Sequence, residues 1–457
     1  MINAKLDSQF QPMIKVINDY KARVAETEST LLTIALEREN GYIATYSMDI
    51  FPDGTGHDEE NYGIVERIIK TLVWLKGGWK VYVSGSEKIY EGIKAAYSKG
   101  GARAFDANHM RKTYEKEFEV VYVENAEDMP KEISSAKPIG RHLDGCRIGF
   151  DAGGSDRKVS AVIDGETVYS EEVVWFPKLQ SDPMYHYNGI LEAMKTAASK
   201  MPRVDAIGIS SAGIYINNRI MAASLFINVS EEDCDKYVKD MYLNVAKEIG
   251  DVPVEVANDG DVTALAGAMS LEDNNILGIA MGTSEAAGYV DGDGNITGWL
   301  NELAFVPVDY CKDSMVDEWS GDYGCGVKYF SQDAVIKLAP AAGIELDESL
   351  SPAEKLKIVQ GLMAEGDKRA ADIYETIGVY FGYAIAYYSM FYDIKHVLIM
   401  GRVTSGDGGV IILEKANEVL SAEFPEVAAK TELHIPDEKA RRVGQSVAAA
   451  SLPEIKR

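Results

Sequence analysis

Three segments of the sequence join an apolar run to small and polar residues that could handle phosphate. They are residues 149–155 (GFDAGGS), 257–261 (ANDGD) and 278–284 (GIAMGTS). Small residues let backbone N–H groups approach phosphate oxygens closely. A carboxylate at the end of a strand, such as Asp151, can hold Mg²⁺ through water. Each segment alone is common in ordinary turns, whereas the three together, in this order, favour a phosphate-handling site.

Hydrophobic patterning predicts the elements that must position these segments. The predicted strands of this region cover 147–150, 159–163, 167–169, 206–210, 254–256, 276–281, 289–290, 397–400 and 433–435. The predicted helices cover about 187–200, 262–269, 328–338, 367–391 and 438–451. Each polar segment therefore follows a predicted strand, which places all three at strand ends of an α/β fold.

Residues 1–140 are predicted to form a separate α/β domain. A polar stretch at 124–145, with two prolines and no strong periodicity, marks its boundary. The order hairpin, helix, strand in 31–84 recurs in 147–210. That recurrence fits a degenerate repeat of the later lobe. Many unrelated α/β chains share the same order, however, and this simpler explanation is favoured.

Composition excludes several classes of function. The 457 residues are 46% hydrophobic and 26% charged, as in ordinary globular proteins, and carry a net charge of −26. So acidic a surface repels phosphate backbones and anionic lipid, so no nucleic-acid partner and no membrane partner is expected. Residues 1–140 hold 18 basic and 22 acidic side chains, so most of the excess charge lies in the rest of the chain.

The cysteines and the N-terminal segment indicate a cytoplasmic protein. The four cysteines form no Cys-x-x-Cys pair and are expected to be reduced thiols. The first residues lack the apolar core of a signal peptide, and no run of 18 apolar residues could span a membrane. The six histidines form no His-Glu-x-x-His motif, so no catalytic zinc is expected.

A family resemblance extends over roughly 310 residues, from about 146 to 457. It is carried by DAGGSDRKVSAVIDGE, ANDGDVTALAGA, LGIAMGTSEAAGYVDGDGNITGWLNE, GCGVKYFSQDAVIKLA, GDKRAADIYETIGVYFGYAIAYYSMFYDIKHVLIMGRV and ARRVGQSVAAASL. These segments resemble the ROK family of bacterial sugar kinases and related repressors, within the actin-like ATPase superfamily. The first 140 residues lie outside the resemblance and do not read as the winged helix of the family's repressors.

The resemblance implies a two-lobed actin-like ATPase fold, which is a ribonuclease H-like sugar-kinase fold, with an additional N-terminal α/β domain at 1–140. The implied lobes are about 141–257 and 258–457. The implied activity is ATP-dependent phosphorylation of a hydroxyl on a sugar or sugar-like substrate, with Mg-ATP bound between the lobes. Lobe closure would exclude water, which competes with the sugar as nucleophile. The resemblance also implies a homodimer or homotetramer.

The resemblance assigns a role to each candidate site residue. Asp259 is the expected general base, which takes a proton from the attacking hydroxyl. Substrate contacts are expected from Asn258, Asp259, Glu302 and Gly213, and Mg²⁺ is expected to bind Asp151 through water. ATP contacts are expected from Gly153, Gly154, Ser155, Gly282, Thr283, Ser284, Gly401 and Arg402. The alternative for Asp259 is an N-cap of the helix at 262–269, and the general base is favoured.

Several departures from the family pattern affect the sugar side. Phe305 stands where the family has a sugar-contacting histidine, and Val327 stands where it has a second glutamate. Cys311 and Cys325 lie fourteen residues apart without the family's further ligands, so no structural zinc is expected. Glu285 falls in the second phosphate loop, where its negative charge would oppose ATP. These departures keep open an alternative, a non-catalytic ROK-like carbohydrate-binding or regulatory protein, although the kinase is favoured.

Overall fold

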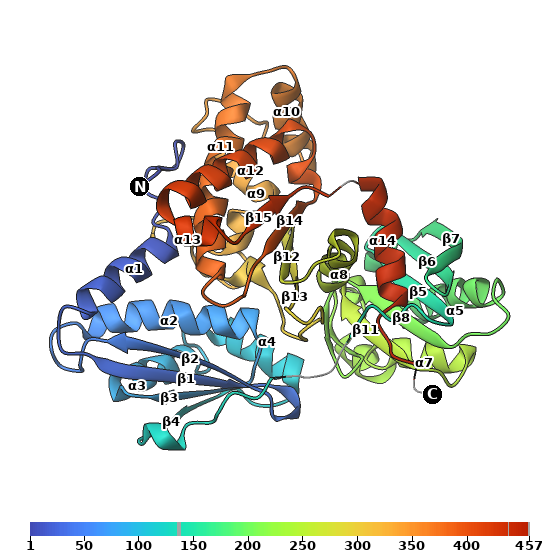
Figure 1. Ribbon diagram of the computed structural model, residues 1–457, viewed down its shortest axis with the longest axis horizontal. Coiled ribbons are helices and arrows are strands. Elements are labelled where there is room, and N and C mark those ends of the chain that lie inside the picture. Colours follow the sequence, from blue (N-terminus) through green and yellow to red (C-terminus); the bar gives the residue numbers. More distant parts are fainter. Residues whose placement is uncertain (135–138, 437, 456–457) are drawn as a thin grey trace. The chain divides into compact units, whose positions relative to one another are not determined.

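The computed structural model describes residues 1–134, 139–436 and 438–455 (Figure 1). Contacts between residues divide the chain into two compact units. Unit 1 comprises Met1–Ser135, Ile279–Ala287 and Trp299–Ile435, and unit 2 comprises Ala136–Gly278, Gly288–Gly298 and Pro436–Arg457. Among the described residues, no helix combines the length and the apolar character that crossing a membrane requires.

Unit 2 is built on a five-stranded mixed sheet. In the order of the sheet its strands are β11 (Val254–Asn258), β8 (Ala206–Ser211), β5 (Cys146–Ala152), β6 (Asp156–Ile163) and β7 (Glu166–Val174). β5, β6 and β7 pair antiparallel, whereas β8 and β11 run parallel to β5. All six residues of β8 are buried, as expected for a strand covered on both faces.

Helices cover both faces of this sheet. α5 (Pro183–Ala198) and α7 (Met241–Ile249) pack together, and α8 (Asp259–Leu271) packs with α14 (Glu438–Ala450). A Cβ on Gly208 would collide with the backbone oxygen of Ala449, so only glycine lets α14 lie directly on the sheet. The remaining elements of unit 2 are the hairpin β9 (Ile214–Ile216) and β10 (Arg219–Ala222), the short helix α6 (Glu231–Asp233) and a π-helix (Cys234–Val238).

The N-terminal part of unit 1 contains a four-stranded sheet of different topology. Its order is β2 (Ile43–Ile50), β1 (Thr30–Glu37), β3 (Lys80–Ser84) and β4 (Glu119–Tyr122). Its helices are α1 (Met13–Val24), α2 (Asp58–Leu75), α3 (Glu87–Ala96) and α4 (Ala104–Tyr114). β3 pairs with β1 antiparallel, whereas the corresponding strand β8 pairs with β5 parallel. The opposite strand directions argue against a duplicated lobe.

A second four-stranded sheet lies in the C-terminal region. Its order is β13 (Glu285–Val290), β12 (Ile276–Met281), β14 (His396–Met400) and β15 (Glu432–His434). Its helices are α9 (Gln332–Leu338), α10 (Pro352–Ala364), α11 (Lys368–Tyr388), α12 (Asp407–Glu423) and α13 (Pro425–Ala428). α11 is buried along most of its length and packs closely on α12. Its tyrosines therefore serve packing, as their helical spacing suggests.

The contacts group the chain differently from the sequence-based domain prediction, which separated 1–140 and divided the rest at about residue 257. α1 packs on α11, so the N-terminal segment belongs to the same unit as most of the C-terminal region. α8 and α14 both belong to unit 2, because they pack on each other and on its sheet. Sequence order alone does not reveal that the chain returns to unit 2 at its end.

Candidate active site

The carboxyl ends of three parallel strands meet at one edge of the unit 2 sheet. In register, Asp151 of β5 lies opposite Ser210 of β8, and Asn258 of β11 lies opposite Ser211. The Ser210 hydroxyl donates to Oδ1 of Asp151 at 2.9 Å. Two of the polar segments singled out from the sequence are therefore brought together by the strand pairing.

Asp259 is the first residue of α8, and Asn258 is the N-cap of that helix. Oδ1 of Asn258 accepts from the backbone N–H of Gly260 at 2.7 Å, as capping side chains do. The N-cap position therefore belongs to Asn258, and Oδ1 of Asp259 also accepts from the N–H of Gly260, at 3.0 Å, so the alternative prediction for Asp259 holds only in part. The Asp259 carboxyl lies at the N-terminal end of α8 and is only partly exposed.

Two carboxyl groups shape the electrostatics of this edge. Burial, together with the repulsion of the nearby Asp151 carboxylate, raises the pKa of Asp259 to about 6. Burial also raises the pKa of Asp151, which the hydrogen bond from Ser210 partly offsets. Two half-buried carboxylates that repel each other form an oxygen donor set of the kind that Mg²⁺ prefers. The residues present thus fit a magnesium ion.

The predicted substrate residues Asn258 and Gly213 are joined directly. Nδ2 of Asn258 donates to the carbonyl oxygen of Gly213 at 2.7 Å. Gly213 has φ 142°, and a Cβ there would collide with the Ala222 carbonyl, so the turn requires glycine. This hydrogen bond fixes the Gly213 turn against the start of α8.

Two tyrosines near this edge were not found from the sequence. The hydroxyl of buried Tyr242 donates to Oγ of Ser211 at 2.9 Å. Burial raises the pKa of both Tyr215 and Tyr242, and Asp259 adds to the effect for each. Both tyrosines therefore lie close enough to sense the charge of Asp259. Neither lies in a recognisable motif, so no sequence signal pointed to them.

The first predicted phosphate loop, 153–155, is exposed at Gly154 and Ser155. The indole Nε1 of Trp175 donates to the Gly153 carbonyl at 2.8 Å and holds one side of the loop. A Cβ built on Gly154 would lie 3.5 Å from Nζ of Lys178. Lys178 thus places an exposed cation at the loop, and the sequence analysis did not identify it because it lies 23 residues after Ser155.

The second predicted phosphate loop belongs to unit 1. Gly282 donates to the backbone oxygen of Ser284 at 2.9 Å, and the side chains of Thr283 and Ser284 are exposed. Gly401, with φ 100°, lies against the backbone of Met281, where any Cβ would collide. The close approach brings Gly401 and the exposed Arg402 next to the start of this loop. Thus the predicted phosphate and adenosine residues of unit 1 lie together.

Glu285 follows this loop but its side chain is buried, with 3% of its surface exposed. Neither carboxyl oxygen has a hydrogen-bond partner, and a Cβ on Gly326 would collide with Oε2. Burial raises the pKa of Glu285 well above its usual value, and Glu302 raises it further. The raised pKa favours the neutral form of the carboxyl, which reduces the predicted repulsion of ATP by Glu285.

The segment that carries Glu302 is held by the end of α2. The backbone N–H groups of Asn301 and Glu302 donate to the carbonyls of Leu75 and Trp74 at 3.0 and 3.1 Å. Phe305 stacks on Trp74, with ring centroids 4.1 Å apart. The N-terminal region thus holds the segment of Glu302, one of the residues predicted to contact the sugar.

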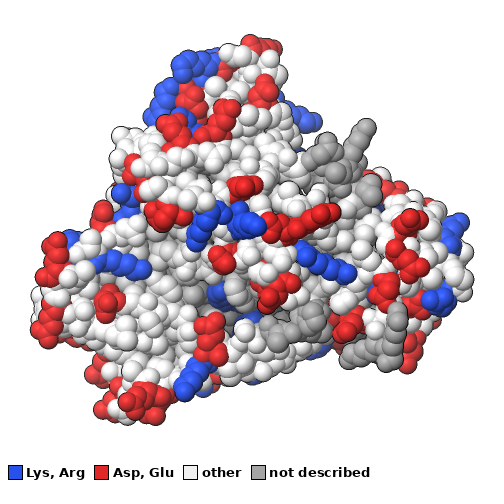
Figure 2. Space-filling model, viewed as in Figure 1, with Lys and Arg blue, Asp and Glu red and all other residues white. Residues whose placement is uncertain are grey.

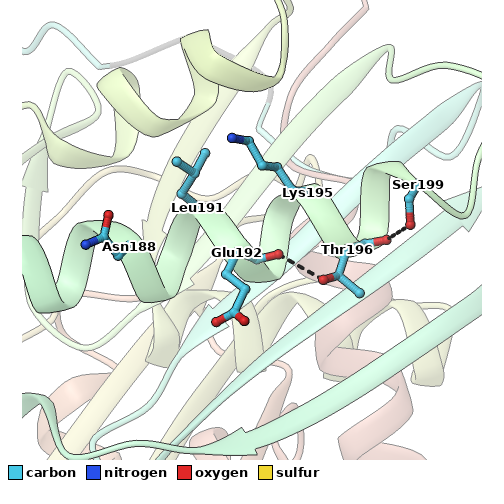
Figure 3. Close-up of a pocket in the computed structure, with 6 residues that line it drawn as sticks. All are labelled: Asn188, Leu191, Glu192, Lys195, Thr196 and Ser199. Atoms are coloured by element: carbon cyan, nitrogen blue, oxygen red, sulfur yellow. Dashed lines mark hydrogen bonds between the residues drawn. The ribbon is translucent and has the colours of Figure 1, made fainter.

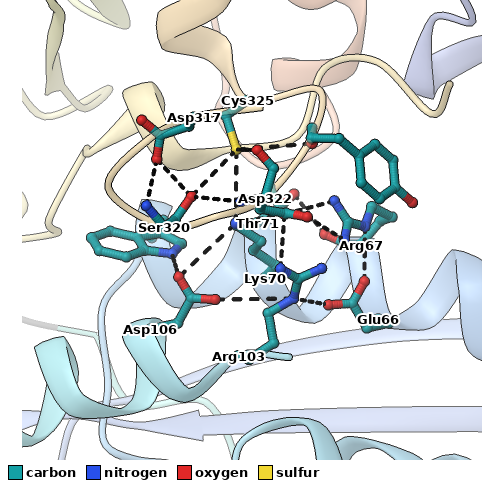
Figure 4. A network of polar contacts seen from close by, with 12 residues as sticks. Glu66, Arg67, Lys70, Thr71, Arg103, Asp106, Asp317, Ser320, Asp322 and Cys325 are labelled. Carbon is teal, nitrogen blue, oxygen red and sulfur yellow. Dashed lines mark hydrogen bonds and ion pairs between the residues drawn. The ribbon is translucent and has the colours of Figure 1, made fainter. Parts of the chain in front are cut away.

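A buried network of charges joins the same helix to the loop that precedes Cys325 (Figure 4). Asp322 accepts two hydrogen bonds from Arg67, at 2.8 and 3.1 Å, and one from Lys70 at 2.6 Å. Arg103 of the segment before α4 pairs with Asp322 at 3.0 Å. Lys70 is fully buried. Within this network each charge is therefore compensated by neighbouring charged side chains in place of water.

Two other surface features, a hollow on α5 and the charge pattern of one face, show no comparable construction. A shallow hollow on α5 is lined by Asn188, Leu191, Glu192, Lys195, Thr196 and Ser199 (Figure 3). Its hydroxyls donate to carbonyls of their own helix, Thr196 to Glu192 and Ser199 to Thr196. On the face drawn in Figure 2, acidic and basic side chains are interspersed. Neither feature resembles a built ligand site.

A sequence profile described as the ROK family matches residues 147–448. Comparison with curated proteins finds no match. Among solved structures, a ROK family transcriptional regulator, a homolog of the E. coli MLC protein, has a TM-score of 0.54 at 19% identity, covering 68% of this chain and 79% of that chain. The ROK hexokinase from Thermus thermophilus has a TM-score of 0.52 at 18% identity, covering 67% and 98%.

A ROK family protein from Streptococcus pneumoniae in complex with sucrose has a TM-score of 0.50 at 12% identity, covering 66% of this chain and 97% of that chain. At these identities the likeness shows the fold alone. The predicted actin-like ATPase fold is confirmed. The similar structures include both a kinase and a transcriptional regulator, so the fold is compatible with either activity.

Proposed function

Because the chain belongs to the ROK family, we propose that it is an ATP-dependent kinase that phosphorylates a hydroxyl of a sugar or sugar-like substrate. The observation that carries this proposal is the position and pKa of Asp259. Its carboxyl lies at the strand edge beside Asp151, with a pKa raised to about 6. A base with a pKa slightly below the working pH is mostly ionised and still accepts a proton readily.

In the proposed reaction, Asp259 accepts the proton of the attacking hydroxyl as that oxygen bonds to the γ-phosphorus of ATP, and the bond from this phosphorus to the bridging oxygen breaks, so that ADP leaves. Both polar atoms of the Asn258 side-chain amide form hydrogen bonds: Oδ1 accepts from the N–H of Gly260, and Nδ2 donates to the carbonyl of Gly213. Asn258 therefore keeps the start of α8 and the adjacent turn fixed while the proton moves. Fixed geometry of this kind contributes to rate by holding the reacting groups in place.

The proposed nucleotide contacts come from Gly153, Gly154 and Ser155, and from Gly282, Thr283 and Ser284. The exposed hydroxyls and small residues of both loops support this assignment. Gly401 and Arg402 are the proposed contacts of adenosine. Asp151 would hold Mg²⁺, which supplies positive charge to the phosphates when it is bound.

The proposed substrate side centres on Glu302, whose backbone is fixed by α2. Phe305 and Val327 are apolar where the family pattern has polar groups: Phe305 stacks on Trp74, and Val327 lies in a buried apolar cluster against which Phe305 packs. An apolar surface at these positions disfavours a substrate that is polar all round. We therefore propose a substrate that is less densely hydroxylated than a simple hexose on this side.

The alternative function is carbohydrate sensing without catalysis. The altered sugar side and the structural likeness to a transcriptional regulator favour it. A sensing protein needs the sugar contacts but has no requirement for a base at Asp259.

The test measures ADP formation with Mg-ATP across a panel of monosaccharides, amino sugars and deoxy sugars. The Asp259→Asn variant is compared with wild type, since asparagine preserves shape but cannot accept the proton. Sugar-dependent turnover that falls at least about 100-fold in the variant supports the kinase. Sugar binding by calorimetry without turnover in wild type would establish the sensing alternative.

A further inference from the structure

Three potential metal ligands meet on two paired strands of unit 1. β14 and β15 are parallel, and their register places His396 directly opposite Glu432 and Leu398 opposite His434. Glu432 and His434 are two residues apart on β15, so their side chains point to the same face of the sheet. Strand pairing thus brings together two histidines that are 38 residues apart in the sequence.

The distances between the donor atoms fit a single ion. Nδ1 of His396 and Nε2 of His434 lie 3.0 Å apart. An Oε2 oxygen of Glu432 lies 3.8 Å from the first nitrogen and 3.7 Å from the second. Tetrahedral bonds of about 2.0–2.2 Å separate neighbouring ligand atoms by about 3.3–3.6 Å. Shifts of a few tenths of an ångström therefore suffice to place all three atoms around one ion.

The chemistry of the ligands selects the class of ion. Two imidazoles and one carboxylate suit zinc and similar transition metals, whereas magnesium prefers a set made only of oxygens. His396 is buried, so one ligand is already held in place by the sheet.

We propose that His396, Glu432 and His434 form a binding site for one divalent transition-metal ion, with zinc the best fit. The three ligands leave a fourth position for water or a small anion. The ion would clamp the short strand β15 onto β14 immediately before the chain passes from unit 1 at Ile435 to unit 2 at Pro436. The site is distinct from the proposed phosphate and sugar residues and does not depend on the kinase proposal.

The site was missed from the sequence because neither histidine belongs to a local motif. The absence of His-Glu-x-x-His predicts no catalytic zinc, and the incomplete cysteine cluster predicts no structural zinc. Both expectations concern other positions. Only the pairing of β14 with β15 reveals the three ligands as a group.

The test uses the full chain, freed of metal by a chelator and then titrated with Zn²⁺ against a chromogenic competitor. We expect one tight site in wild type, and at least about tenfold weaker binding in His434→Ala and in Glu432→Gln. Glu432 is exposed, so its variant is expected to fold even if the histidine variant does not. His57→Ala is the matched control, because His57 also lies beside a glutamate, Glu60, on the surface of unit 1.

Two further measurements separate a specific site from binding elsewhere, such as at Cys234. Co²⁺ in place of Zn²⁺ is expected to give the visible absorption of a tetrahedral ion in wild type and not in His434→Ala. Zn²⁺ at saturation is expected to raise the unfolding temperature of wild type and of His57→Ala, since an ion that binds only the folded state stabilises it. Equal zinc affinity in wild type and in both ligand variants would overturn the proposal, as would the absence of a tight site.

Discussion

Removal of the central acid of the buried charge network should strongly destabilise unit 1. Asp322 is 3% exposed and contacts three cations, Arg67, Lys70 and Arg103, at 2.6–3.1 Å. Glu66 and Asp106 are the other two acids that form ion pairs with these cations, and Asp317 joins the network only through Ser320. Asp322→Asn keeps the shape and removes one negative charge, which leaves one cation without compensation.

The expected loss is about 3–5 kcal/mol in the free energy of unfolding, since an uncompensated charge cannot be resolvated inside the protein. Urea unfolding, followed by tryptophan fluorescence, measures it. Trp74 is a suitable reporter because its indole donates to Asp106 at 2.7 Å within the network. The control is Glu119→Gln, which breaks the exposed pair with Lys80 and should cost no more than about 1 kcal/mol.

A second variant tests the charge balance itself. Asp322→Asn combined with Lys70→Met removes one charge of each sign, so the pair should be less destabilised than the sum of the two single variants. A loss in Asp322→Asn no larger than in the Glu119 control would refute the reasoning. Strict additivity in the double variant would equally show that the two charges are not coupled.

Three further predictions concern the candidate site. The rate of ADP formation should rise with pH around 6, because Asp259 must lose its proton to act as base; a pH–rate profile that is flat between pH 5 and 7 would contradict this role. Glu285→Gln should stabilise the protein at pH 7 and have little effect near pH 4, as measured by urea unfolding. The raised pKa of Glu285 means that the folded state holds the Glu285 proton more tightly than the unfolded state does. The free energy of unfolding of wild type therefore falls as the pH rises above the pKa of the unfolded glutamate, by about 1.4 kcal/mol per unit of difference between the two pKa values. Lys178→Met should raise KM for ATP several-fold and leave KM for the sugar unchanged, because the ammonium lies at Gly154; equal changes in both would indicate a general structural defect.

Much of unit 2 was predictable because its signals are local. The strand predicted at 147–150 is β5, and the strand predicted at 254–256 is the start of β11. Apolar runs that end in small and polar residues mark strand ends, and parallel pairing then places Asp151 and Asn258 at one edge. The position of Asp259 in the site follows from that pairing, and its role as base stays a prediction.

The sugar side was less accessible, because its construction depends on contacts between distant segments. The hydrogen bonds from Asn301 and Glu302 to the end of α2 join residues more than 200 positions apart. The burial of Glu285 was not predicted, because β13 is buried on both faces, Glu285 included. Alternation along a strand gives two faces, and only the packing of the sheet decides which of them are buried.

The position of α14 on the unit 2 sheet also affects how the protein is made. Because Gly208 has no side chain, the backbone of β8 is uncovered at this position until residues near Ala449, at the end of α14, pack on it. A nascent chain emerges from its N-terminus onward, at about 5–20 residues per second, so this part of the backbone stays uncovered for at least about 10 s after β8 is complete. Unit 2 therefore finishes folding only after α14 has been synthesised, and its apolar sheet is exposed to aggregation until then. A chain truncated before α14 should accordingly be recovered as aggregate.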